Sequence, residues 1–138
     1  MSTEANKVIV RKFVAAADRQ DFDHTFACLS PDVVVHRAVA PGPLDFPTFF
    51  QFGKMWHGAF PDEQMTFEDQ IAEGEKVVSR MASTATHTGE FQGIPPTGKQ
   101  IRVTGKGIER IADGKIVERW GVVGMLGVMQ QLGVVPMS

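Results

Sequence analysis

The sequence predicts an α+β fold, in which helices come first along the chain and an antiparallel sheet follows. Apolar residues recur at three- and four-residue spacing up to about residue 20, and residues 46–60 form a second aromatic-rich, helix-length block. Residues 65–123 instead form a series of strands separated by short turns. The chain has 138 residues, of which 43% are hydrophobic, so we expect a single domain over residues 1–138.

The first part of the chain contains three predicted helices and one strand. The first helix spans residues 3 to about 20, with Thr3 as its N-cap. A short helix over residues 22–29 follows, and it ends at Pro31 because proline cannot continue a helix. Residues 33–36 are predicted as a short strand, and residues 46–60 as the third helix.

The second part of the chain is predicted to form an antiparallel meander. Its strands cover residues 65–72, 76–87, 100–111 and 115–123. Asp113-Gly114, between the last two strands, is a strong signal for a tight hairpin. Residues 125–132 could form a short final helix, although the glycines of this segment weaken that prediction.

Charge and composition exclude several classes of protein. The 14 Lys and Arg residues against 16 Asp and Glu residues leave no surplus of cations for a phosphate backbone, so no nucleic-acid partner is expected. No apolar run approaches the roughly 18 residues of a membrane span. The single cysteine and the absence of a secretory signal favour a cytoplasmic location. Since there is no tyrosine, mechanisms that need a tyrosine acid are excluded.

Four segments carry a family resemblance. They are AFPD at residues 59–62, THTGEFQGIPPTGK at 86–99, RIADGKIVE at 110–118 and QQLG at 130–133. In this order they resemble the SnoaL-like polyketide cyclase family over nearly the whole chain. The resemblance implies a cone-shaped fold of the nuclear-transport-factor-2-like superfamily, in which a curved antiparallel sheet wraps the N-terminal helices around one apolar pocket. It also implies a reaction without a metal or an organic cofactor.

The resemblance implies a specific chemistry, in which family members close a polyketide ring by an intramolecular aldol condensation. Their acid/base is an aspartate at the end of the last strand. By its position before the QQLG segment, Gly124 stands in place of that aspartate here, and Gly121 stands at a second acidic position. A histidine that assists in some members falls near Gly107. The chain must therefore use other residues if it catalyses proton transfer.

Glu118 is the leading candidate for a replacement base. Strict alternation along the last strand places Glu118 on the same face as Ile116, Trp120 and Gly124. Burial beside Trp120 would raise the pKa of its carboxyl towards a working value. The alternative is that Glu118 lies at the strand rim and pairs with an arginine, such as Arg119 or Arg110.

His36 and His87 complete the predicted catalytic set. Each ends a predicted strand, and a neutral imidazole carries one donor and one acceptor with which it could relay a proton or bind an enolate. A structural hydrogen bond is the simpler alternative for either one. The chain's 4 histidines show no close ligand spacing, so no metal site is predicted.

The predicted substrate-binding residues are mostly aromatic. Arg80 is included because a lone guanidinium in mid-strand is costly unless it pairs with a carboxylate, such as Glu68 or Glu109, or faces an anionic ligand. Aromatic residues at these spacings could equally be ordinary core. The predicted set is Trp56, His57, Phe60, Arg80, Phe91, Trp120 and Gly124.

Two functions remain open from the sequence. The first is a cofactor-independent cyclase or isomerase that acts on a hydrophobic, carbonyl-bearing small molecule. The second is a protein of the same fold that binds a small molecule without catalysis. In either case we expect a homodimer, because an open sheet face with apolar residues needs cover.

Overall fold

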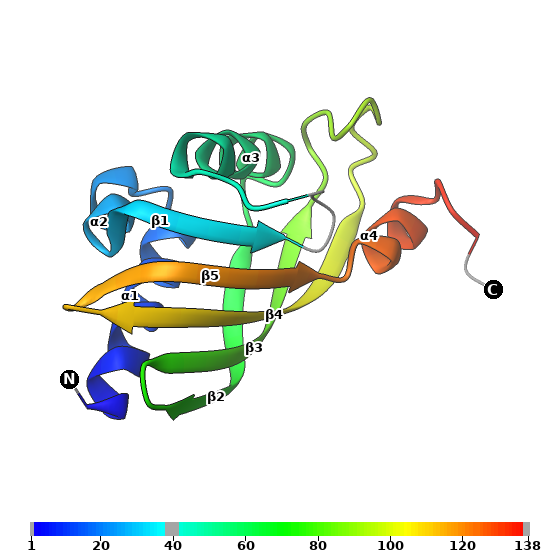
Figure 1. Cartoon of the computed structure of the whole chain (residues 1–138). Helices are drawn as coiled ribbons and strands as arrows, with labels where there is room; N and C mark the ends of the chain where they lie inside the picture. The colour runs from blue at the N-terminus through cyan, green and yellow to red at the C-terminus, as the bar shows by residue number, and fades with distance from the viewer. Residues whose placement is uncertain (1, 38–41, 137–138) are drawn as a thin grey trace.

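The α+β class is confirmed by a computed structural model, which describes residues 2–37 and 42–136 (Figure 1). The elements follow one another as α1 (Thr3–Asp18), α2 (Phe22–Ala27), β1 (Leu29–Arg37), α3 (Phe46–Ala59), β2 (Gln64–Glu73), β3 (Lys76–Thr86), β4 (Gln100–Ala112), β5 (Lys115–Val123) and α4 (Met125–Leu132). Among the residues described, no helix is long and apolar enough to cross a membrane.

The five strands form one open sheet in the order β1-β5-β4-β3-β2. The meander β2 to β5 is antiparallel as predicted, but β1 pairs in parallel with β5, so the sheet is mixed. The parallel pair needs a long crossover, and α3 with three strands supplies it. Helix α1 packs against β2 and β3, α3 lies beside β1, and α4 contacts β4 (Figure 1).

Side-chain caps fix where the helices begin. The hydroxyl of Ser2 accepts a hydrogen bond from the amide of Ala5, so the N-cap of α1 is Ser2 and not Thr3. Asp45 caps α3 in the same way. The second predicted helix ends earlier than expected, because β1 already begins at Leu29. Pro31 is tolerated in β1 because β1 is an edge strand. Proline lacks a backbone N–H, and on an edge strand that N–H can face away from the sheet, so no hydrogen bond between strands is lost.

The hairpin between β4 and β5 has the predicted geometry. Asp113 and Gly114 have φ values of 51° and 74°, the two positive angles that a type I′ turn requires.

A β-bulge in β5 reverses the alternation of its side chains. Ile111 of β4 faces Ile116, whereas the adjacent Arg110 faces Glu118, so Val117 is an extra residue on β5. Ile116 is fully buried in the core beneath α1. Beyond the bulge, Arg119 and not Glu118 lies on the same face as Ile116.

The core has two parts. One lies between α1 and the inner face of the sheet and contains Val10, Phe13, Val35 and Ile116. The other lies between α3, α4 and the far ends of β3 and β4, and it is built around Trp56, Phe60 and Phe91. Helix α3 lies next to both and carries aromatic residues towards the space between them.

Candidate active site

The concave face of the sheet and helix α3 enclose a cavity with two adjoining hollows. The first hollow, of about 160 Å³, lies between α3 and the inner faces of β3, β4 and β5. The second, of about 190 Å³, lies between α1, α2 and α3 and is rich in phenylalanine. Residues that line both hollows are Phe49, Phe52, Trp56, Glu63, Met65 and Arg119. Together the hollows reach the size that a drug-sized ligand needs.

Glu63 is the carboxylate of this cavity. It immediately precedes β2 and shares the inward parity of Met65 and Phe67, which pack against the core. The hydroxyl of Ser83 donates a hydrogen bond to its Oε2 at 2.9 Å. Burial raises the pKa of the Glu63 carboxyl, and this effect exceeds the opposing effect of the hydrogen bond from Ser83.

A buried ion pair forms the sheet side of the cavity. Arg119 donates from Nε to Oε2 of Glu109 at 2.8 Å, and Glu109 is only 1% exposed. Burial raises the pKa of Glu109, while the charge of Arg119 opposes that shift. The guanidinium of Arg119 also lies over the rings of Phe13 and Phe49, at 5.7 and 5.5 Å from their centroids.

Two glycines make room for this ion pair. Gly107 and Gly121 face each other across β4 and β5, next to the Glu109 and Arg119 pair. A Cβ at Gly107 would lie 3.1 Å from Oε2 of Glu109, and one at Gly121 would lie 3.4 Å from a terminal nitrogen of Arg119. The family resemblance implies a histidine near Gly107 and an acid at Gly121. In this chain the side chains of Glu109 and Arg119 occupy the space beside those two glycines.

Glu118, His36 and Trp120 lie on the opposite face of the sheet, which corrects the expectation that Glu118 faces inwards. Glu118 accepts hydrogen bonds from His36 at 2.8 Å and from Arg110 at 3.3 Å, and the bond from His36 lowers the pKa of its carboxyl. The His36 ring stacks on Trp120, with 5.3 Å between centroids. The cause is the bulge at Val117, which strict alternation does not anticipate.

His87, Phe60 and Phe91 belong to the core and do not line the cavity. All three are fully buried. Nδ1 of His87 lies 3.0 Å from the hydroxyl of Thr97, and the amide of Thr97 donates to the same atom at 3.2 Å. His87 therefore fastens the loop between β3 and β4 to the core.

Of the other predicted binding residues, two line the cavity. Trp56 lines both hollows and His57 lines the second, where burial lowers the pKa of the imidazole. Arg80 points away from the cavity and pairs with Asp69 at 2.6 Å on the surface, a different partner from those expected. Gly124 lines neither hollow. It is the N-cap residue of α4, and a Cβ there would lie 3.3 Å from the carbonyl oxygen of Thr104.

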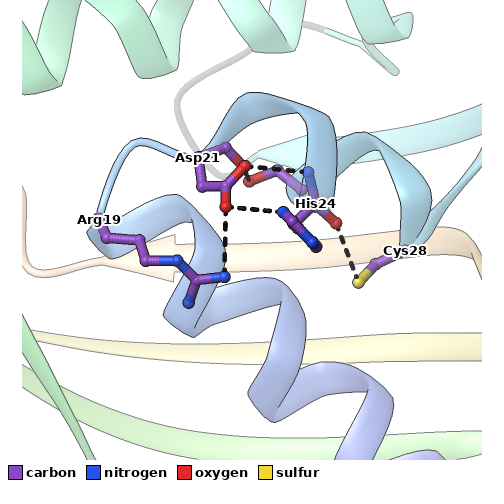
Figure 2. Close-up of polar contacts among 5 residues, drawn as sticks. Arg19, Asp21, His24 and Cys28 are labelled. Carbon is purple, nitrogen blue, oxygen red and sulfur yellow. Dashed lines mark hydrogen bonds and ion pairs between the residues drawn. The ribbon is translucent and has the colours of Figure 1, made fainter.

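A second polar cluster surrounds the start of α2 (Figure 2). Asp21 accepts hydrogen bonds from the backbone amide of His24 at 3.3 Å and from Arg19 at 3.4 Å, and the thiol of Cys28 donates to the carbonyl of His24 at 3.4 Å. Burial raises the pKa of the Cys28 thiol, which disfavours the thiolate. These contacts cap a short helix. Within residues 2–37 and 42–136, no three His, Cys, Asp or Glu side chains are grouped as metal ligands.

Comparison with known proteins places the chain in a family. The SnoaL-like polyketide cyclase family matches residues 7–132. The chain belongs to this family. No curated protein matches the chain.

Three solved structures have the same fold. AclR, a proposed hydroxylase from Streptomyces galilaeus, is 31% identical with a TM-score of 0.92, and the match covers 99% of this chain and 86% of AclR. IdmH, a proposed polyketide cyclase from Streptomyces antibioticus, is 28% identical with a TM-score of 0.85, over 94% of this chain and 99% of IdmH. TsrD from Streptomyces laurentii is 25% identical with a TM-score of 0.83, over 98% and 99% of the two chains.

The charged residues of this SnoaL-like cavity were not among the residues predicted from the sequence. Arg37, Glu63 and Arg119 line the cavity, and Glu109 holds Arg119 in place. Alternation extended by one residue would have found two of them, because Arg37 follows the buried Val33 and Val35 on β1, and Glu63 precedes Met65.

Proposed function

We propose that this SnoaL-like protein is a cofactor-independent enzyme that transfers protons on a hydrophobic, carbonyl-bearing small molecule bound in the cavity. The observation that carries the proposal is Glu63, a mostly buried carboxylate with a raised pKa that borders both hollows. A base of this kind is effective near neutral pH, because its affinity for a proton is higher than that of a free glutamate.

Glu63 would act as the general base. Its carboxylate takes a proton from the carbon next to the carbonyl, and the C–H electron pair moves through the new C=C bond onto the carbonyl oxygen. The guanidinium of Arg119 borders both hollows and would stabilise the negative charge on that oxygen. Glu109 fixes Arg119 through Nε, and among residues 2–37 and 42–136 the terminal nitrogens of Arg119 donate no hydrogen bond, so they can donate to a ligand.

Two outcomes follow from the enolate. Where a C=C bond of the substrate is conjugated with the enolate, the resulting dienolate can take the proton back from Glu63 at a different carbon, which is an isomerisation. Alternatively, its carbon can attack a second carbonyl of the same molecule, and the resulting alkoxide takes the proton from Glu63, which closes a ring by an aldol reaction. Both outcomes return Glu63 to the carboxylate and need no cofactor. Membership of the cyclase family favours ring closure.

The pH dependence of proton exchange tests the proposal. We expect the protein to accelerate exchange of the acidic C–H protons of β-tetralone in D₂O, measured by NMR. The rate should fall as Glu63 becomes protonated, with a midpoint above the value of about 4.3 of a free glutamate. A protein that binds β-tetralone without accelerating exchange would instead be a binding protein.

We also infer that the protein forms a homodimer through the outer face of its sheet. In Figure 1 no helix covers this face over β3, β4 and β5. A row of outward side chains crosses the sheet in register, from Ile71 and Val78 through Ile108 to Trp120 and His36. Ile71 and Val78 are 66% and 43% exposed, which is unusual for a row of this length unless a partner covers it.

Light scattering at micromolar concentration should give a mass of twice 15.1 kDa. Val78→Glu places a charge in the row and should shift the protein towards the monomer. Leu126→Glu is the matched control, because Leu126 is 63% exposed on α4, away from the row. A wild-type mass of one chain, or a dimer unaffected by Val78→Glu, would contradict this interface.

A further inference from the structure

Arg37 is a cavity cation that the proposed mechanism does not use. It is the last residue of β1 and shares the inward parity of Val33 and Val35. Its neighbour in register on β5 is Gly121, which has no side chain to fill the space beside it. The guanidinium carbon of Arg37 lies over the ring of Phe52, 3.3 Å from the ring centroid. Arg37 is thus held at the wall of the first hollow.

Arg37 has no carboxylate partner among residues 2–37 and 42–136, whereas other arginines of the sheet do. Arg80, Arg102, Arg110 and Arg119 each pair with an acidic side chain. Residues 38–41, which follow Arg37, are Ala, Val, Ala and Pro and add no acid to the sequence there. A half-buried guanidinium without a counterion is costly unless a ligand supplies the negative charge.

The charged groups around Arg37 do not supply it with a partner. Arg119 lines the same hollow, but Glu109 already neutralises it, and Glu63, which also lines that hollow, forms no ion pair with Arg37. Burial lowers the pKa of Arg37, and the nearby charge of Arg119 lowers it further. An anionic group would therefore be attracted to this end of the cavity.

The order of residues along the cavity indicates how a ligand would lie. Arg37 lines the first hollow but not the second, and Glu63 lines both. The second hollow is walled by phenylalanines, among them Phe22, Phe26 and Phe50. A ligand with its anionic group at Arg37 would place its middle beside Glu63 and its apolar end among the phenylalanines.

We propose that Arg37 is an anion subsite, and that the natural ligand is a hydrophobic keto acid whose carboxylate binds this guanidinium. A carboxylate fits better than a phosphate, because its two oxygens match two parallel N–H donors of one guanidinium and it has a smaller charge to compensate. The subsite rests on the proposed function, since it selects the substrate of the same cavity and orients it towards Glu63.

Binding of a matched pair of probes tests the subsite. β-Naphthoic acid is an anion at neutral pH, and β-naphthamide has nearly the same shape without the charge. Binding can be followed by the fluorescence of Trp56, which lines both hollows, with Trp120 on the outer face as a constant background. We expect the wild type to bind the acid about tenfold more tightly than the amide.

Arg37→Gln should remove this preference by weakening the acid and leaving the amide unchanged, and Arg37→Lys should retain part of it. Arg80→Gln is the charge-matched control and should bind as the wild type does, because Arg80 lies outside the cavity. A preference that persists in Arg37→Gln would overturn the assignment. Equal affinities in the wild type would overturn the subsite but leave the cavity as a ligand site, whereas failure of both probes to bind would overturn the subsite and the proposed function together.

Discussion

Glu63→Gln should lower the rate of β-tetralone exchange by roughly two to four orders of magnitude, because it removes the proton acceptor. Glutamine has the same shape, and its side-chain oxygen can still accept the hydrogen bond from Ser83. The free energy of unfolding at neutral pH should not fall. The folded protein favours the uncharged form of this side chain, as the raised pKa of Glu63 indicates, and glutamine is always uncharged.

Glu118→Gln is the matched control for this experiment. It makes the same chemical change in a carboxylate that lies on the outer face of the sheet and bonds to His36. We expect exchange to continue at the wild-type rate. If Glu63→Gln kept exchange within about threefold of the wild type while Glu118→Gln lost it, the base would be Glu118.

Arg119→Met should cause a large loss of stability. It leaves Glu109, 1% exposed, without its counterion, and breaking a buried pair in this way costs about 3–5 kcal/mol. The melting temperature should fall by roughly 10 °C or more. The loss should be smaller at pH 5 than at pH 8. Without the charge of Arg119, which opposes the effect of burial, the pKa of Glu109 rises further above its value in the unfolded chain, so the folded variant gains stability as Glu109 binds a proton.

The double variant Glu109→Leu/Arg119→Met separates the ion pair from simple packing. With both charges removed, most of the lost stability should return, because an apolar pair of similar size carries no desolvation penalty. Calorimetric scans of the two variants and the wild type make the comparison. A double variant as unstable as Arg119→Met would mean that the packing of Arg119 against Phe13 and Phe49, and not its charge, holds this wall together.

Most of the fold could be predicted from the sequence because each element has local signals. Hydrophobic periodicity correctly predicted the helix over residues 46–60 and the strand over residues 115–123. Turn chemistry correctly predicted the turn at Asp113-Gly114. The parallel pairing of β1 with β5 has no such signal, since it joins residues more than 80 positions apart, as in the hydrogen bond between His36 and Glu118.

The candidate site was harder to predict, because one irregularity in β5 changes which side chains face the cavity. A single extra residue at Val117 exchanges the two faces of β5, so Glu118 and Trp120 turn outwards and Arg119 turns inwards. The residue types near Val117 do not indicate a bulge. Trp56 was correctly predicted to line the cavity. A large aromatic side chain on a helix that packs beside a sheet is directed towards the space between the helix and the sheet.

The most direct test of the central claim is a crystal structure of the protein with β-tetralone bound. The account predicts that the ring system lies between Phe52, Trp56 and Met65, with the acidic carbon about 3–3.5 Å from a carboxylate oxygen of Glu63. The carbonyl oxygen should face the guanidinium of Arg119. A ketone bound on the outer face beside His36 and Glu118, or bound in the cavity with its acidic carbon directed away from Glu63, would contradict the account.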